Sequence, residues 1–469
     1  MPNVFHVKAM KSRFSGRAGQ RGQALIYGMF MIVASVVALF FLFNTGQLSQ
    51  EKTRLVNTAD AVAYSAGVMD ARTLNFLAYT NRAMLANTVA IAQLVSLSSW
   101  AAYMDQLSSG VQDGWYTEYI PAIPAWVTAE YSGSYINEYL NESGLLEQLA
   151  NQSDESFIKS VLVNAQAVAY NGLVVARPGV MNDVAEANYR DDGTVAVESL
   201  LSSTTNFNDF VSAYSGDDRT RFAEVAVASA KSDGFVKSRS WVLFANWTDG
   251  CPYLLDWIVR TGGTDLIGFD EWKAMDVLSE YQWHEVYDVC FFVEQPAGYA
   301  QNVAADNEAS DTNWSRYDSA RTRNPSASYL ASNNSKDWGY SGLPKFYDLS
   351  EEYLDKDDPR LRHAVGLKRK IAETRTSEGV ALVRNSGADN RLAKGLNNYK
   401  AEPADGDSMV AAAAAEVYFD RGSDNPYGSG KFGKPKEIGS LFNPFWQVHL
   451  VTPTAAERAA ASGSAMVLP

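Results

Sequence analysis

The first fifty residues contain no acidic side chain, and the first carboxylate in the chain belongs to Glu51. Five cations lie in this acid-free segment: Lys8, Lys11, Arg13, Arg17 and Arg21. Without these five, 35 basic and 54 acidic residues remain, so the rest of the chain has a net charge of about −19. Because so acidic a surface repels nucleic acid, we exclude a DNA- or RNA-binding role.

Residues that commonly carry catalysis or metal binding are also scarce. The 469 residues include four histidines and two cysteines, and the G-x-S-x-G motif of serine hydrolases is absent. A glycine-rich match at 428–433 is followed by Lys434, but Pro435 stands where a phosphate-binding loop needs Ser or Thr. We therefore identify no catalytic residue, no metal ligands, no cofactor and no small-molecule substrate, and we expect the chain not to be an enzyme.

One long uncharged apolar stretch is present, from Ala24 and Leu25 to Phe43. As a helix, its twenty residues span about 30 Å, the thickness of the hydrocarbon core of a bilayer. Because the five cations all precede it, the positive-inside rule predicts a cytoplasmic N-terminus and an exported remainder. The alternative is a cleaved signal peptide, although the stretch is longer than the usual apolar region and no small-x-small site follows Phe43.

The two cysteines, Cys251 and Cys290, fall in the part expected to be exported, where oxidation is favoured. A disulfide between them would close a loop of about 40 residues and stabilise the fold by about 4 kcal/mol on the chain-entropy estimate. Two separate buried thiols are the alternative.

A helical pattern continues beyond the apolar stretch. It is marked by a row of residues seven apart, and no proline lies between Pro2 and Pro121. The row comprises Leu48, Leu55, Val62, Met69, Phe76 and Ala83. We predict one long helix, or two nearly collinear ones, over residues 24–105, with this row available for helix packing. The alternative is an ordinary amphipathic helix that packs on its own domain.

Further elements are predicted from local patterns. A second Ala- and Val-rich helix is expected over 154–189, interrupted near Pro178, as a partner of the first helix, and shorter helices over 218–232 and 269–281. Strands are expected over 235–245, 281–294, 360–371, 411–419 and 445–451. Loops are expected over 106–150, 300–345, 385–408 and 420–437. The predicted fold class is α+β, with a helical first half and a mostly antiparallel β second half.

These elements imply a linear organisation along the chain. We predict a basic cytoplasmic segment at 1–22, a transmembrane helix at 23–44 and a helical extracytoplasmic region at 45–232. An α+β extracytoplasmic domain at 233–454 and a mobile tail at 455–469 complete it.

Two short motifs flank the apolar stretch: Arg21-Gly22-Gln23-Ala24 before it and Arg54-Leu55-Val56-Asn57-Thr58-Ala59-Asp60-Ala61 after it. With them, the first part of the chain resembles the TadE/TadG-like proteins of bacterial Tad (Flp) pilus assembly. The resemblance implies a structural or assembly component, minor pilin-like or TadG-like, anchored in the inner membrane with its bulk periplasmic or at the cell surface. It implies the membrane and other pilus or pilin-like subunits as partners. It also gives Gly22–Gln23 as the candidate processing site, with cleavage after Gly19, before Gln20, as the alternative.

Two departures from that family limit what the resemblance implies. The D-x-S-x-S metal motif of many TadG-like proteins is absent, which argues against metal-dependent cell adhesion of that kind. Position five after Gly22 is Tyr27 rather than the Glu usual in pilins, which argues against a conventional major pilin. Two alternatives stay open: a membrane-anchored periplasmic scaffold or sensor, and a membrane-anchored periplasmic cell-wall hydrolase.

Overall fold

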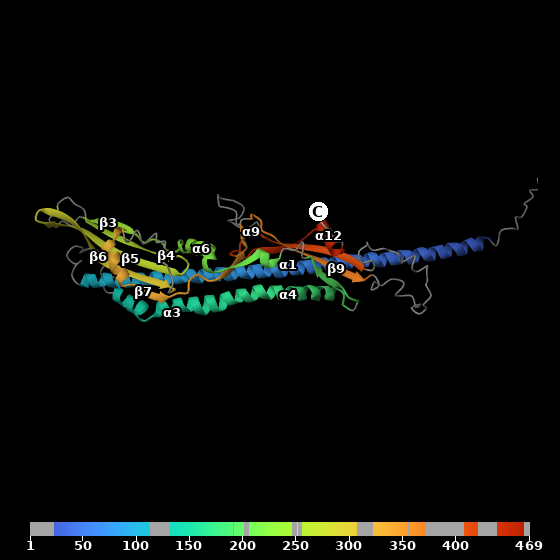
Figure 1. Cartoon of the computed structure of the whole chain (residues 1–469), viewed down its shortest axis with the longest axis horizontal. Helices are drawn as coiled ribbons and strands as arrows, with labels where there is room; N and C mark the ends of the chain where they lie inside the picture. Colours follow the sequence, from blue (N-terminus) through green and yellow to red (C-terminus); the bar gives the residue numbers. More distant parts are fainter. Residues whose placement is uncertain are drawn as a thin grey trace, which may run out of the picture.

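The computed structural model describes residues 23–112, 132–190, 192–200, 206–245, 251, 256–306, 322–354, 356–370, 408–420 and 439–463. The cationic segment from Lys8 to Gly22, the glycine-rich match at 428–433 and most of the predicted loops at 385–408 and 420–437 lie outside these residues. Over the described residues the fold is α+β, as predicted. The molecule is elongated along its first helix. The hairpin of strands β5 (Glu271–Val286) and β6 (Val289–Ala305) lies at one end, and the apolar N-terminal part of the helix lies at the other (Figure 1).

Helix α1 (Gln23–Gln112) runs for 90 residues, or about 135 Å at 1.5 Å per residue. The absence of proline and the abundance of alanine favour an unbroken helix. The predicted long helix is therefore confirmed as a single element, and it extends past residue 105 into the predicted loop.

A second helical layer follows one side of α1 (Figure 1). It consists of η1 (Glu138–Glu142), α3 (Leu145–Asn151), η2 (Gln152–Val163) and α4 (Asn164–Asn188). The loop prediction for 132–150 was wrong, because Leu146 and Ala150 bury one face of α3 in the core. The predicted interruption at Pro178 was also wrong. Pro178 lies on the exposed side of α4, where water can hydrate the carbonyl that loses its helical partner.

The sheet nearer the apolar N-terminal part of α1, which we call the proximal sheet, lies against the first folded part of that helix. Its strands are β1 (Ala196–Ser199), β9 (Leu361–Lys370), β10 (Ser408–Phe419) and β11 (Trp446–Val451), antiparallel in that order. Gly67 permits the close approach, because a Cβ there would lie 2.5 Å from Cγ2 of Val448. The three strands predicted near 360–371, 411–419 and 445–451 are all present. Helix α12 (Ala455–Ala461) packs on the face of the sheet formed by β9 and β10, so these residues of the predicted mobile tail are helical and packed.

The distal sheet is larger. It consists of β3 (Trp241–Ala245), β4 (Asp256–Ile267), β5 (Glu271–Val286), β6 (Val289–Ala305) and β7 (Lys336–Gly339), and of its described pairings β6–β7 alone is parallel. Strand β5 contradicts the predicted helix at 269–281. Residues 271–280 are buried on both faces, so the polar–apolar alternation that identifies a half-buried strand is missing. The strand predicted at 281–294 is two strands joined at Tyr287 and Asp288.

Short elements connect these layers. They are α5 (Phe207–Phe210), β2 (Val211–Tyr214), which pairs with β8 (Phe346–Leu349), η3 (Gly216–Arg219), α6 (Thr220–Ala230), α8 (Pro325–Asn333) and α9 (Glu351–Leu354). The helix predicted at 218–232 corresponds to α6. Helix α8 and strand β7 show that the 300–345 segment is not entirely loop.

Three apolar clusters follow one another along α1. Leu55 and Val62 pack with α4 and strands β9 and β10; Leu74 and Leu77 pack with β8 and Trp446; Ile91 packs with α6 and the distal sheet. Each cluster joins residues from both sides of the predicted boundary at 232/233. The two predicted extracytoplasmic regions therefore share their cores, with α1 as the common element.

Candidate membrane anchor and assembly surface

The first turns of α1 form the candidate membrane anchor. Every large apolar side chain from Leu25 to Phe43 is exposed, from 42% at Val37 to 79% at Leu25. The apolar window of this helix has no buried residue, as expected of a surface that lipid covers. The helical segment Ser132–Asn188 is also long and apolar enough to span a bilayer, but it is partly buried and packs against α1. The N-terminal stretch is thus the better candidate.

A buried charge cluster follows where α1 enters the folded part. Arg369 on β9 places Nε 2.9 Å from Glu51 Oε1 of α1, and its Nη2 donates to the Asp192 carbonyl over 2.6 Å. Arg54 bonds the Asp192 carboxylate and the Asn188 carbonyl. Both guanidinium groups lie over the Tyr189 ring, at 4.3 and 4.4 Å from its centroid. Burial, and then Glu51, raise the pKa of Tyr189 to about 12, which keeps its hydroxyl protonated.

A second buried ion pair, between Asp70 of α1 and Arg177 of α4, lies more than four helical turns beyond Arg54 along α1. Nη1 of Arg177 lies 3.0 and 3.2 Å from the two carboxylate oxygens of Asp70. Burial raises the pKa of Asp70 to about 6, against the opposing effect of Arg177. His363 on β9 is buried nearby, and burial followed by the Arg177 charge lowers its pKa to about 3, so it is neutral at pH 7. The anchor helix is therefore fixed to both α4 and the proximal sheet.

The seven-residue row does not form one continuous surface. Leu55 and Val62 are fully buried inside the chain, Leu48, Met69 and Ala83 are half-buried, and Phe76 is 39% exposed. A straight helix with 3.6 residues per turn rotates by about 20° over each heptad, so a row seven residues apart drifts around the helix. Leu55 and Val62 of the row therefore pack within this chain and are not available to another subunit.

A buried carboxylate organises the distal sheet. Asp276 on β5 accepts hydrogen bonds from Nε and Nη2 of Arg239 over 3.0 and 2.7 Å, and from Nη2 of Arg260 over 2.8 Å. Ser99 of α1 donates to the same carboxylate over 3.0 Å. A Cβ at Gly262 would lie 2.5 Å from Asp276 Oδ1, so glycine is required beside this network. The network joins α1 to the sheet and is structural.

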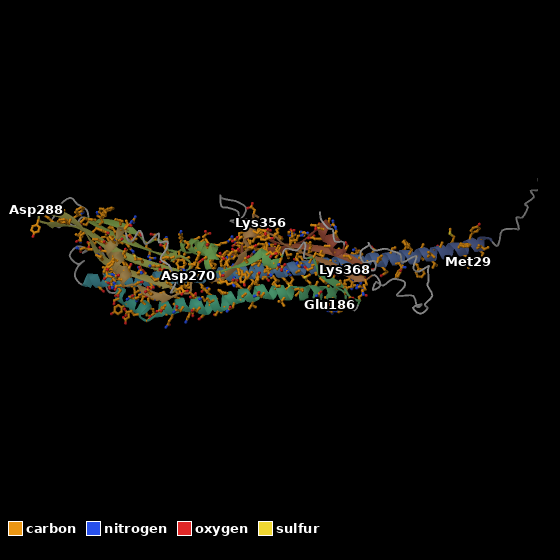
Figure 2. The ribbon with its side chains drawn as sticks, viewed as in Figure 1. Met29, Glu186, Asp270, Asp288, Lys356 and Lys368 are labelled. Carbon is orange, nitrogen blue, oxygen red and sulfur yellow. A yellow bond between two sulfur atoms is a disulfide. The ribbon has the colours of Figure 1, made fainter. Side chains whose placement is uncertain are left out.

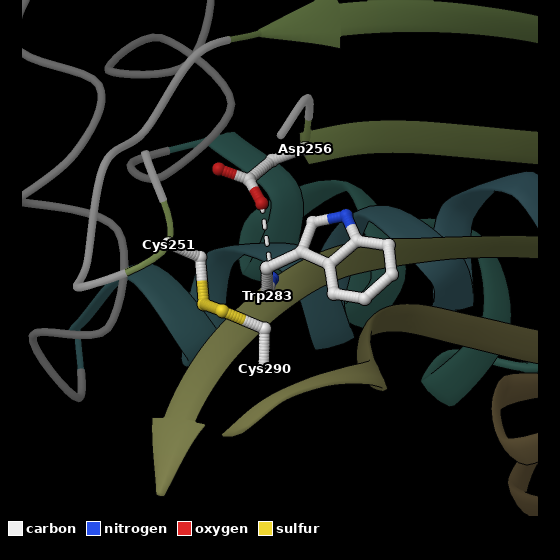
Figure 3. The surroundings of a disulfide bond; sticks show 4 residues. All are labelled: Cys251, Asp256, Trp283 and Cys290. Carbon is white, nitrogen blue, oxygen red and sulfur yellow. Dashed lines mark hydrogen bonds between the residues drawn. A yellow bond between two sulfur atoms is a disulfide. The ribbon is translucent and has the colours of Figure 1, made fainter. Parts of the chain in front are cut away.

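Beyond that network, a disulfide lies near the far end of the distal sheet. Cys251 and Cys290 form a disulfide with Cα atoms 6.1 Å apart, which ties the segment after β3 to β6. Beside it, the Trp283 backbone N–H donates to the Asp256 carboxylate over 3.0 Å (Figure 3). The bridge joins Cys251 to Cys290 near the start of β6, beside the turn of the β5–β6 hairpin.

The tip exposes apolar side chains on both faces of the sheet. We define the distal aromatic tip as Trp241, Val242, Leu243, Phe244, Trp257, Tyr287, Val289, Phe291, Phe292 and Val293, which are all exposed. Aromatic contacts cross its strands, with ring centroids 5.9 Å apart between Phe244 and Trp257 and 5.2 Å between Trp257 and Phe292. Figure 2 places Asp288 of the hairpin turn and Met29 of the anchor at opposite ends of the molecule.

The turn at the end of the tip is unusual. Tyr287 and Asp288 have φ of 50° and 60°, values that two-residue hairpin turns need but that favour Asn or Gly. Tyr287 is 96% exposed, so its ring gains no packing within the chain. An aromatic residue at a strained, exposed position is consistent with a role in contact to another molecule.

Comparison with known protein families gives one match. Residues 22–71 match the family model described as Flp pilus-assembly TadE/G-like. These residues are similar to that family, and we call them the TadE/G-like segment. The TadE/G-like segment begins beside the first residue of α1, covers the candidate membrane span and ends just after Asp70. No curated protein and no solved structure matches the chain.

The TadE/G-like segment supplies the α1 side of both charge clusters, through Glu51, Arg54 and Asp70. Their partners lie more than 100 residues away, and sequence analysis identified none of them: Arg177, Tyr189, Asp192, His363 and Arg369. No local motif marks such residues, because each is an ordinary charged or aromatic side chain until the fold brings it to α1. Among the described residues, no group of three or more His, Cys, Asp or Glu side chains is arranged to hold a metal ion.

Proposed function

We propose that this chain is a structural or assembly component of a Tad/Flp-type pilus, minor pilin-like or TadG-like, anchored in the bacterial inner membrane. Its N-terminus would be cytoplasmic and its bulk periplasmic or at the cell surface. The observation that supports this proposal most directly is the continuity of α1. One helix carries the exposed apolar span, the TadE/G-like segment and the core positions of the folded part.

The anchor also offers a surface for lateral association. Ala24, Gly28, Ser35 and Ala38 fall on one face of α1, and a Cβ at Gly28 would meet nothing within 4 Å in this chain. Small residues on one face allow transmembrane helices to approach closely. We propose that other pilin-like helices pack there, while the rigid upper part of α1 carries the distal aromatic tip away from the membrane toward a further partner.

Processing between Gly22 and Gln23 remains part of the proposal. Gln23 lies in helix α1, so cleavage at this point would leave a chain whose first residue is part of that helix. Mass spectrometry of the N-terminal peptide distinguishes the two forms. A peptide that begins at Gln23 identifies a processed subunit, and an intact peptide across Gly22 identifies an anchored assembly factor.

Gene deletion with complementation by anchor variants tests the proposed function. The double variant Ile32→Asp/Val36→Asp puts two charges in the apolar span, at about 2.5–3.5 kcal/mol each on insertion scales. The control, Val56→Asp/Tyr79→Asp, puts two charges on exposed positions of α1 beyond the span. We expect deletion to abolish surface pili, the control to restore them and the anchor variant to fail. Normal pili after deletion would contradict the proposal and favour a scaffold or sensor unrelated to pili.

We further propose that the chain acts by assembly and not by catalysis. The buried carboxylates of Asp70, Asp276 and Asp348 each pair with an arginine, an arrangement typical of structural ion pairs rather than of a general acid. A cell-wall hydrolase is the alternative. Zymography of the purified full chain on peptidoglycan tests it, and a cleared band that persists at high purity would contradict a purely structural role.

A further inference from the structure

The outward face of α4 carries a regular seam of apolar and small residues. Ala165, Val168, Gly172, Val175 and Gly179 are spaced three and four residues apart in alternation, the spacing of a helix face that meets another helix. Val168 and Val175 are 72% and 81% exposed. We call these five residues the α4 seam. Large and small side chains alternate along it.

The α4 seam lies opposite the face that packs on α1. Gln166, Leu173 and Met181 bury that inner face. At about 100° per residue, their average direction is about half a helical turn away from the average direction of the seam. From residue 160 to residue 176 the helix carries no charged side chain on any face. A helix whose outer face met only water would ordinarily be polar there, so the composition indicates a surface that becomes covered.

The two seam glycines have no explanation within the chain. Glycine weakens a helix interior relative to alanine, and it is retained where something approaches closely or φ is positive. Gly172 and Gly179 both have helical φ, and a Cβ built on either would meet nothing within 4 Å. The close approach that would favour glycine must therefore come from outside the described part of this chain.

We propose that the α4 seam binds the α4 seam of a second copy of this chain, in a parallel two-helix contact. The inference rests on the anchoring proposed above, because two copies held in one membrane have parallel long axes and so present α4 in the same direction. The seam is then complementary to itself, since each valine of one copy faces a gap above Gly172, Gly179 or Ala165 in the other. Val168 and Val175 are seven residues apart, the spacing of β-branched residues in parallel two-stranded coiled coils. The absence of charge from residue 160 to residue 176 avoids like-charge repulsion there.

The proposed pairing leaves the other surfaces free. In Figure 1, α4 lies on one side of α1, and the two sheets lie on the other. A dimer through α4 would keep both distal aromatic tips and the small-residue faces of both anchors available to other subunits.

Single-cysteine cross-linking in native membranes tests the inference. Both native cysteines are joined in the disulfide, so an added cysteine supplies the new reactive thiol. Val168→Cys and Val175→Cys place it in the seam, and Val174→Cys is a matched control on the flank of the same helix, 41% exposed. After mild oxidation we expect a dimer of the 51.4 kDa chain with both seam variants, several-fold above the control. Equal yields at all three positions, or seam adducts with other proteins alone, would overturn the inference.

A second variant separates pairing from folding. Gly172→Leu/Gly179→Leu fills the gaps of the seam, and because nothing in the chain lies near either position, the fold should tolerate it. Leucine is the better helix former, so we expect an unchanged or higher unfolding temperature together with loss of the Val175→Cys cross-link. An undiminished cross-link would overturn the inference. If cross-links are absent while the chain stays in the membrane and cells keep their pili, this inference alone fails. If deletion leaves pili intact, the proposed function fails instead.

Discussion

From Leu25 to Phe43, α1 exposes every large apolar side chain, whereas from Glu51 to Val95 the same helix packs against other elements and buries apolar residues in three successive clusters. The first region is an unbroken apolar stretch, whereas polar residues interrupt the second. They also differ in charge: the first region has none, and the second carries Glu51, Arg54 and Asp70, each with a partner from another element. An apolar helix without charges is suited to lipid, and one whose charges are paired with partners from other elements is suited to a protein core.

The two regions should differ most in how one added aspartate changes the free energy of unfolding. Val62→Asp puts an unpaired carboxylate at a fully buried position and should lower the free energy of unfolding by more than about 4 kcal/mol. Val36→Asp should leave that free energy unchanged and weaken membrane insertion by about 2.5–3.5 kcal/mol. Denaturant unfolding in detergent and membrane partitioning measure the two effects. Similar losses of folding stability in both variants would show that the anchor region is packed by protein.

Because Leu55 and Val62 are core residues, an aspartate at either position reports on folding before it reports on assembly. The row of seven-residue spacing is therefore a poor place to look for an interface, and exposed positions such as the α4 seam are better.

The second largest effect on stability is expected at the buried ion pair between Asp70 and Arg177. Asp70→Ala leaves the Arg177 charge buried without its partner and should cost about 3–5 kcal/mol. The double variant Asp70→Leu/Arg177→Met removes both charges and should recover most of that loss. The exposed Lys356–Glu352 pair is the control, since Lys356→Ala should cost less than about 1 kcal/mol. A double variant as unstable as the single one would contradict a simple ion-pair role.

The disulfide should affect the tip without affecting the anchor. Cys251→Ser/Cys290→Ser should lower stability by about 2–4 kcal/mol. Amide hydrogen exchange should increase in β3 and in the β5–β6 hairpin, while α1 near Leu55 keeps its protection. Equal loss of protection along the whole of α1 would mean that the tip and the proximal core unfold as one unit.

A smaller, pH-dependent effect concerns His363. Its pKa is lowered to about 3 in the folded chain, so the unfolded state binds the extra proton as the pH falls below about 6.5. The stability present above that pH should therefore be lost on acidification, by up to about 1.4 kcal/mol per pH unit.

His363→Leu should show less of this loss between pH 6.5 and pH 4, measured by thermal unfolding. The raised pKa of Asp70 acts in the opposite direction between about pH 4 and 6, but it is common to both proteins and cancels in the comparison. His449→Leu keeps His363 and should follow the parent. Identical pH profiles for the parent and His363→Leu would show that His363 is not held neutral.

Helix α1 could be predicted because its signals are local. The absence of proline and the recurrence of apolar residues specify α1, and the uncharged stretch specifies the candidate anchor. The sequence Thr454-Ala455-Ala456-Glu457 is a capping box that also marks α12, and this local signal was overlooked.

Strand β5 and the partners of the charged residues of α1 could not be predicted, because they are defined by tertiary contacts. Strand β5 is buried on both faces, so its pattern resembles that of a buried helix segment, and only its pairing with β4 and β6 identifies it as a strand. Arg177, Asp192 and Arg369 have no local signature, since their role arises when α4 and β9 meet α1. The α4 seam was visible as spacing, but its exposure was not.

Protease protection on spheroplasts gives the most direct test of α1 as a helix that both crosses the membrane and organises the fold. The full chain would carry an epitope at each end, and protease would be added from outside. We expect the C-terminal epitope to be lost and a membrane-protected N-terminal fragment of about 45 residues to remain, since a span of about 20 residues crosses the bilayer. A soluble chain without its N-terminal epitope, or a protected C-terminal epitope, would contradict an anchored chain with a cytoplasmic N-terminus.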